Sequence, residues 1–221
     1  MGTLVLVRHG QASFGSDDYD RLSELGHRQC VRLGEWFRGR GMRFDAVLRG
    51  TLRRHEQSLA ALEEGLGTAH AAQALPGLDE YDSVAVIRTV HEGPLAPART
   101  PEEVRGHFRL LRDGLRRWAR GEVLPQGLPP YAAFADAVDA ALATAAETDA
   151  YVLVVSSGGP ICTAVARTVG APPEAFVELN LRLRNSALTE LVVSRGRRAL
   201  HTFNHLPHLD GPPYDGWITY A

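Results

Sequence analysis

Short apolar runs divide the chain, and each has the composition of a buried strand. Residues 3–7, 45–48 and 151–155 are continuous runs rich in valine and leucine, which is typical of strands buried on both faces of a parallel sheet. Two further runs, residues 186–193 and 199–203, flank a Ser-Arg-Gly-Arg turn and predict a closing β-hairpin.

Between these runs, apolar residues return every three to four positions, which predicts amphipathic helices. Ser23 is placed to cap the first of them. A second helix is expected to open at residues 50–51 and to end at Gly65 and Gly67, because glycine is a common stop signal. The alternation of strand and helix favours a parallel sheet with right-handed crossovers.

The pattern changes in the middle of the chain, where helices are separated by joints rich in proline and glycine. Residues 100–103, Thr-Pro-Glu-Glu, have the form of a capping box that opens a helix, and residues 131–146 predict an alanine-rich helix. We expect a single domain over residues 1–221 with a helical cap inserted at about residues 81–150. The predicted fold class is α/β, a three-layer α/β/α arrangement with a mostly parallel central sheet.

Composition narrows the class of protein. With 44% hydrophobic and 23% charged residues and a net charge of −2, the chain is typical of a globular protein without a global basic field, so we expect no nucleic-acid or membrane partner. Cys30 and Cys162 lack disulfide or metal spacing and indicate reduced thiols. The first apolar run is too short for a signal peptide, so the expected location is the cytoplasm.

All 24 positions counted as lysine or arginine are arginine. The sequence therefore excludes a Schiff-base lysine and a P-loop of the G-x-x-x-x-G-K-[ST] type. An anion must be bound here by arginine, histidine or backbone amides, and arginine suits phosphate because its planar fork binds two oxygens at once.

Residues that carry chemistry follow the predicted strands. Arg8-His9-Gly10 follows the first strand, residues 49–54 follow the second, and residues 156–159, Ser-Ser-Gly-Gly, follow the third. Ligands of open α/β sheets bind at the carboxyl ends of strands. A histidine beside arginines suits nucleophilic attack on a phosphoryl group, and an acid from the loop at residues 78–82 would protonate the leaving oxygen.

At these positions the chain resembles the histidine phosphatase superfamily, the phosphoglycerate mutase-like family. Residues 6–11 match its L-V-R-H-G-[EQ] signature, residues 50–58 align with S-x-L-x-R-A-x-Q-T, and residues 78–80 match L-x-E. The resemblance spans almost the whole chain. It implies the fold predicted above and a reaction that needs no metal and no other cofactor.

The same resemblance implies a role for each site residue. His9 would be the nucleophile that is phosphorylated transiently, Arg8 and Arg54 would hold the phosphoryl group, and Glu80 would act as general acid and then as general base. Asp79 and Asp82 are acidic neighbours of Glu80, so the sequence leaves open which carboxyl group is the acid.

One position departs from the family pattern. Where the family reads S-H-G-G, this chain has Ser157 before Gly158, and both residues are candidates for phosphate binding, with a passive packing role as the alternative for Ser157. Losing a preorganised donor costs roughly 10²- to 10³-fold in rate. The N-terminus of the following helix, His55, or a tail histidine such as His205 or His208 could offset the loss.

The predicted function is phosphomonoester hydrolysis through a phosphohistidine, with a small phosphorylated metabolite as substrate. The alternatives are a catalytically weak phospho-ligand-binding protein of the same fold and, less favoured, a phosphoglycerate-type mutase. The cap would set specificity. Its arginine-rich segment, residues 109–120, is expected to be a solvated face, with recognition of a second anionic group as the other interpretation.

Overall fold

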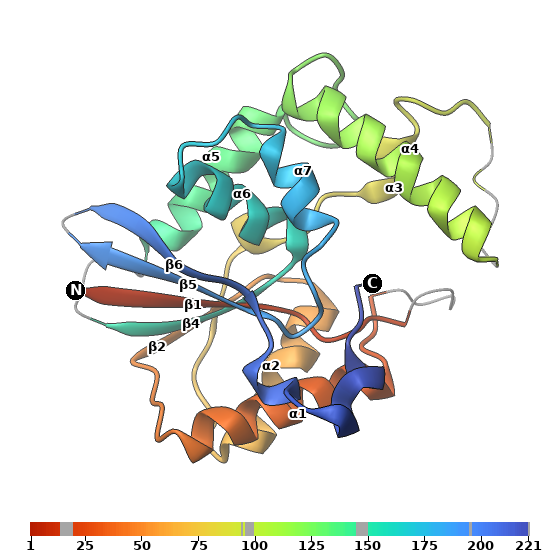
Figure 1. Ribbon diagram of the computed structural model, residues 1–221. Coiled ribbons are helices and arrows are strands. Elements are labelled where there is room, and N and C mark those ends of the chain that lie inside the picture. Colours follow the sequence, from red (N-terminus) through yellow and green to blue (C-terminus); the bar gives the residue numbers. More distant parts are fainter. Residues whose placement is uncertain (14–19, 94, 96–99, 145–149, 195, 221) are drawn as a thin grey trace.

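The computed structural model describes residues 1–13, 20–93, 95, 100–144, 150–194 and 196–220 (Figure 1). Within these ranges, six strands form one sheet in the order β3-β2-β4-β1-β5-β6. Their bounds are Gly2–Arg8 for β1, Ala46–Arg49 for β2, Gln73–Ala74 for β3, Tyr151–Ser156 for β4, Leu188–Ser194 for β5 and Arg197–His205 for β6.

The sheet is mixed, with a parallel half and an antiparallel half. Strands β3, β2, β4 and β1 pair in parallel, whereas β5 runs antiparallel to β1 and forms a hairpin with β6. The apolar runs and the hairpin turn therefore predicted the sheet correctly, and only the two-residue strand β3 was missed. In the register, Arg8 pairs with Ser156, so the residues that follow β1 and β4 leave the sheet side by side.

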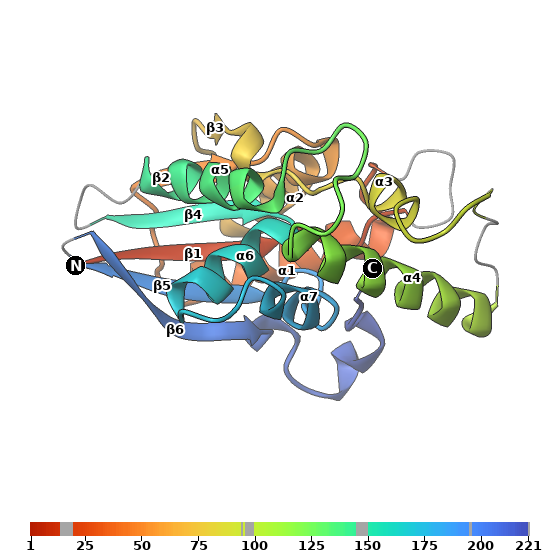
Figure 2. The same ribbon diagram turned by 90° about the horizontal axis from the view of Figure 1, so that it is seen from above.

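Helices cover both faces of the sheet, which confirms the three-layer arrangement (Figures 1 and 2). Helices α1 (Glu24–Gly39) and α2 (Arg53–Leu66) lie on one face. On the other lie α5 (Tyr131–Ala143), α6 (Gly158–Thr168) and the short helix α7 (Ala175–Asn180), which the sequence did not predict.

Alternation along β1 supplies both apolar cores. Val5 and Val7 pack with buried residues of α1 and α2, whereas Leu4 and Leu6 belong to the larger cluster beneath α5 and α6. Since side chains alternate across a strand, one apolar run can serve both layers. This burial holds the carboxyl end of β1, where the candidate nucleophile begins, in a fixed position.

The predicted cap of α1 is confirmed, because the Ser23 side chain accepts a hydrogen bond from the Gly26 amide. The predicted start of α2 was wrong, and of the two predicted stop residues Gly67 is confirmed and Gly65 is wrong. The helix begins at Arg53, and Gly65 lies inside it, against α1, where a Cβ atom would overlap the Val31 carbonyl. The actual stop is Gly67, in the left-handed conformation with φ of 78°.

Helices α3 (Ser83–Ile87) and α4 (Pro101–Ala119) lie beyond the carboxyl ends of the parallel strands (Figures 1 and 2). The predicted capping box opens α4: Thr100 accepts from the Glu103 amide, and the Glu103 carboxylate accepts from the Thr100 amide. The predicted helix at residues 131–146 is observed up to Ala143, and residues 145–149 lie outside the described ranges.

The tail after β6 contains two 3-10 turns, Pro207–Leu209 and Pro212–Trp217, and packs against α1. The Arg28 guanidinium lies 4.9 Å from the centre of the Trp217 ring, and Gln29 Nε2 donates to the Trp217 carbonyl at 2.6 Å. This docking brings the end of the tail to the site described below. Among the described residues, no helix has the length and apolar character needed to cross a bilayer.

Candidate active site

A cavity of about 1010 Å³ opens at the carboxyl ends of β1, β2 and β4, beneath α4. Its lining includes Arg8, His9, Arg54 and Glu80, the residues nominated as catalytic from the sequence. The structure thus brings together side chains from three separate segments at the edge of the sheet where α/β folds bind ligands.

His9 is oriented as a nucleophile. Its Nδ1 lies 2.7 Å from the Gly10 carbonyl oxygen, which can only accept, so Nδ1 carries the proton and Nε2 keeps its lone pair. Burial, and then the guanidinium groups of Arg54 and Arg8, hold the pKa of His9 well below its ordinary value. The imidazole is therefore neutral near pH 7, the state in which it can attack phosphorus.

Gly10 lets this segment approach α1 closely, because a Cβ atom there would overlap the Gly26 carbonyl. The Gly10 amide donates to Ser58 Oγ at 3.1 Å, which ties the segment to α2 as well. The turn that presents His9 is therefore fixed from both helices of this face.

The two arginines are held by different partners. Arg8 donates from Nη1 to the backbone carbonyls of Leu183 and, at 2.9 Å, of Tyr220, so the tail helps to aim it. Arg54 pairs with Asp20, at 2.7 Å between Nη1 and Oδ1, and Asp20 also accepts from the Arg53 amide. Asp20 was not predicted as a site residue.

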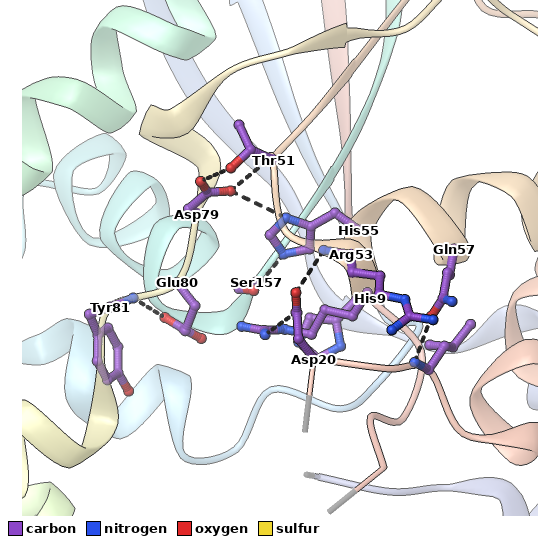
Figure 3. A network of polar contacts seen from close by, with 12 residues as sticks. His9, Asp20, Thr51, Arg53, His55, Gln57, Asp79, Glu80, Tyr81 and Ser157 are labelled. Atoms are coloured by element: carbon purple, nitrogen blue, oxygen red, sulfur yellow. Dashed lines mark hydrogen bonds and ion pairs between the residues drawn. The ribbon is translucent and has the colours of Figure 1, made fainter. Parts of the chain in front are cut away.

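Glu80 is the acidic side chain best placed to be the proton donor. Its carboxylate accepts from the Gly159 amide at 3.0 Å and from the Tyr81 amide at 3.3 Å, the second of which is drawn in Figure 3. Burial raises its pKa, which favours the protonated form. The exposed Asp82 accepts from two amides at the start of α3, and Asp79 accepts from Thr51. Both neighbours therefore have other structural tasks.

Ser157 and Gly158 lie behind the cavity wall and are absent from its described lining. Ser157 is fully buried, and its Oγ lies 2.7 Å from His55 Nε2. A Cβ atom at Gly158 would overlap the Asn180 side chain, so a larger residue there would have to displace Asn180. The Gly159 amide, at the N-terminus of α6, is bound to Glu80.

Of the histidines considered as substitutes, only His55 approaches the nucleophile. Its ring is fully buried and its centre lies 5.8 Å from that of His9. His205 is exposed on β6, and His208 is bound to Ser186 Oγ at 2.9 Å. Sequence reasoning noted His55 but missed its acidic neighbour, Asp79, which lies 3.6 Å from His55 Nδ1.

The arginine-rich helix α4 has two kinds of arginine. Those towards its C-terminal end are paired with acids: Arg112 and Arg116 with Glu178, Arg117 with Asp113, and Arg120 with Glu122 and Glu174. Arg105, Arg109 and Arg112 line the cavity, and of these three Arg105 and Arg109 have no acidic partner within the described ranges. The solvated-face interpretation therefore fits only part of the segment.

No group of three or more histidine, cysteine, aspartate and glutamate side chains within the described part of the chain could hold a metal ion. The side chains that the cavity offers include a neutral imidazole, two guanidinium groups and a carboxyl group with a raised pKa.

The chain is similar in sequence to a known protein family and to several curated proteins. A family model described as the histidine phosphatase superfamily (branch 1) matches residues 4–206. The 2,3-bisphosphoglycerate-dependent phosphoglycerate mutase of Chelativorans sp. (strain BNC1) is 33% identical over 91 residues, 38% of this chain and 41% of the mutase. The mitochondrial serine/threonine-protein phosphatase Pgam5 of Drosophila sechellia is 26% identical over 201 residues, 86% of this chain and 58% of Pgam5. The chain spans about half the length of these curated relatives.

Solved structures show the same fold. A phosphoserine phosphatase mutant from Entamoeba histolytica, in complex with phosphoserine, superposes with a TM-score of 0.68 at 19% identity, covering 95% of this chain and 100% of that one. A mycobacterial glucosyl-3-phosphoglycerate phosphatase gives a TM-score of 0.64 at 22% identity, covering 92% of this chain and 99% of the other.

Proposed function

Because this chain belongs to the histidine phosphatase superfamily (branch 1), we propose that it is a phosphomonoester hydrolase acting through a phosphohistidine on a small phosphorylated molecule. One observation carries the proposal. The neutral imidazole of His9 has its free Nε2 in a cavity that is also lined by Arg8, Arg54 and the protonatable Glu80.

In the first step, His9 Nε2 attacks phosphorus. The N–P bond forms as the bond from phosphorus to the ester oxygen breaks, and Glu80 gives its proton to the departing oxygen. Arg8 and Arg54 offset the charge on the phosphoryl oxygens, a task that preorganised guanidinium groups perform without reorganisation.

In the second step, water attacks the phosphohistidine. Glu80, now a carboxylate, takes a proton from the water as the O–P bond forms and the N–P bond breaks, which releases phosphate and restores His9 Nε2. The raised pKa of Glu80 suits both steps, because the group holds a proton nearer to neutral pH than an ordinary carboxyl group does.

The test is hydrolysis of p-nitrophenyl phosphate and of a panel of alkyl phosphates by the wild type and by His9→Ala. The control is His70→Ala, because His70 is a partly buried histidine that lies outside the cavity lining and contacts the Glu63 carboxylate. We expect His9→Ala to lose roughly three or more orders of magnitude in rate and His70→Ala to retain activity.

A phosphorylated wild-type protein, trapped by rapid denaturation in alkali and absent from His9→Ala, would support the covalent step. Equal turnover by the wild type and His9→Ala would refute His9 as the nucleophile. If both proteins bind phosphate and neither turns over any substrate, the chain is a phosphate-binding protein and the hydrolase proposal is wrong.

A further inference from the structure

Figure 3 shows a chain of four polar side chains, those of Thr51, Asp79, His55 and Ser157, that the proposed steps do not use. None of the four is among the residues that line the cavity. Thr51 donates to Asp79 from both its amide and its hydroxyl, Asp79 Oδ1 lies 3.6 Å from His55 Nδ1, and His55 Nε2 lies 2.7 Å from Ser157 Oγ. The distance of 3.6 Å exceeds a hydrogen bond, and His55 Nδ1 is buried without a hydrogen-bond partner in the described structure.

The position of this chain couples it to the nucleophile. The rings of His55 and His9 are 5.8 Å apart between centres. Ser157 follows β4 as His9 follows β1, and the His9 amide donates to the Ser156 carbonyl between them at 2.9 Å. A charge on His55 therefore acts at short range on a phosphoryl group at His9.

The fixed charges at the site explain why such a charge is needed. The cations that act on His9 are Arg8 and Arg54; Asp20 is paired with Arg54, and Asp79 adds a second anion beside His55. With both imidazoles neutral, the charges of these four groups cancel. Arg105 and Arg109 add positive charge elsewhere on the cavity lining, but a dianionic phosphoryl group at His9 would meet no net positive charge from the four groups around the two imidazoles, which is electrostatically unfavourable.

Resting on the hydrolase function proposed above, we propose that His55 takes up a proton when a phosphoryl group binds, and acts through Ser157 as a positioning residue. In the empty site, Ser157 Oγ–H donates to His55 Nε2. On binding, the proton passes from the buffer acid to Nε2, the Nδ1–H closes on Asp79, and Nε2–H donates to Ser157 Oγ. The Ser157 hydroxyl proton is then free to turn towards the phosphoryl site.

Every charged or titratable group around His55 enters this balance. Burial lowers its pKa, Asp79 opposes that effect, Arg54 on the same helix lowers the pKa further, and Asp20 raises it. His9, the remaining neighbour, must stay neutral in order to attack. An incoming anion adds to the effect of Asp79 and Asp20, so the pKa of His55 rises on binding.

The experiment measures proton uptake on anion binding by titration calorimetry in two buffers of different ionisation enthalpy at the same pH. Sulfate is the probe, because it stays dianionic near neutral pH and contributes no protons of its own. His55→Gln retains a polar side chain and removes the titration, and His70→Gln is the matched control. We expect wild type and His70→Gln to take up a fraction of a proton approaching about one, and His55→Gln to lose that uptake and bind roughly tenfold more weakly.

A second variant covers the case in which His55→Gln does not fold. Asp79→Asn alters a partly exposed residue and should also reduce the uptake, because the imidazolium loses its counter-charge. Uptake unchanged in both folded variants would overturn the inference while leaving the hydrolase proposal intact. A wild type that binds neither sulfate nor phosphate would instead contradict the hydrolase proposal.

Discussion

Replacement of Glu80 by glutamine tests the acid directly. The amide is nearly isosteric and can still accept from the Gly159 amide, which now holds the carboxylate at 3.0 Å, so the wall of the cavity should keep its shape. What the variant loses is the proton that the buried carboxyl group delivers to the leaving oxygen. The loss should therefore depend on how much the leaving group needs that proton.

A positioned general acid contributes roughly 10²- to 10⁴-fold in rate, which is about 3 to 5 kcal/mol of transition-state stabilisation. An alkoxide is a poor leaving group, so we expect Glu80→Gln to lose this full range on alkyl phosphates. The p-nitrophenolate ion departs without protonation, so the loss on p-nitrophenyl phosphate should stay under about tenfold.

The two shifted pKa values predict how the hydrolysis rate changes with pH. Because burial raises the pKa of Glu80, the wild type should keep its acid protonated to a higher pH than an ordinary glutamate, and its rate on alkyl phosphates should fall as pH rises through that pKa. On the acidic side, the pKa of His9 is well below its ordinary value, so protonation should stop the reaction only in that lower range.

The assay is steady-state hydrolysis of one alkyl and one aryl phosphate across pH by wild type, Glu80→Gln and Asp79→Asn. Glu80→Gln should lack the fall at high pH on the alkyl substrate. Equal losses on both substrates, or a larger leaving-group dependence in Asp79→Asn than in Glu80→Gln, would refute Glu80 as the acid.

Three further predictions follow from the geometry. Gly159→Ala should lower the rate on alkyl phosphates by roughly 10²-fold, since its Cβ would displace the acid, whereas Gly106→Ala, in open space on α4, should match wild type; equal rates for both variants would contradict this. Arg109→Ala should raise KM up to roughly fivefold for phosphate esters with a second anionic group and leave KM for neutral esters unchanged, and a uniform change would contradict a recognition role. Ser157→His should slow turnover, because the His55 ring already occupies the space that the new imidazole would need. The double variant Ser157→His with His55→Ala should turn over faster than His55→Ala alone. Faster turnover by Ser157→His than by wild type would contradict this and show that the space beside residue 157 is open.

The core of the fold could be predicted because its strands are buried on both faces. A strand such as β1 must be apolar at every position when α1 and α5 cover its two sides, and such runs stand out from helical periodicity. Strand β3, with two exposed residues, carries no such signal. Helix α7 has only six residues, too few to show a helical period.

Gly65 illustrates a different limit. A glycine near the end of an apolar period has the appearance of a stop signal, but here it lets α1 and α2 approach, with a Cβ atom excluded by the Val31 carbonyl. Gly34 plays the reciprocal part, against the Leu62 carbonyl. The sequence alone cannot distinguish a glycine that ends a helix from a glycine at a close contact between helices, because both roles require the absence of a side chain. Only the position of the neighbouring helix shows which role a glycine has.

At the site, sequence motifs identified the residues whose side-chain type determines the chemistry. The residues that hold those side chains in place were found only in the structure. Arg8, His9, Arg54 and Glu80 all reach the cavity. Asp20 could not be inferred, since it comes from a loop and acts only through its distance to Arg54. These partners are set by tertiary approach, which no local pattern records.

A pair of departures in the sequence did carry a signal. His55 stands where the aligned motif has alanine, and Ser157 stands where the pattern has histidine. Considered alone, His55 is an ordinary substitution on a helix, and Ser157 is the loss of a histidine from the pattern. The structure places the two side chains 2.7 Å apart, so an imidazole lies beside the position at which the pattern has histidine.

The absence of lysine makes the position of His55 beside Ser157 more important for the charge of the site. Arginine stays charged at every pH at which the protein is folded, so Arg8 and Arg54 cannot adjust when an anion enters. Of the groups that the proposed steps use, His9 must stay neutral to attack, and Glu80 must hold its proton until the leaving oxygen takes it. The His55 ring, 5.8 Å from that of His9 between centres, has neither task, so its charge can follow that of the ligand, and Asp79 lies beside it to stabilise the charged form.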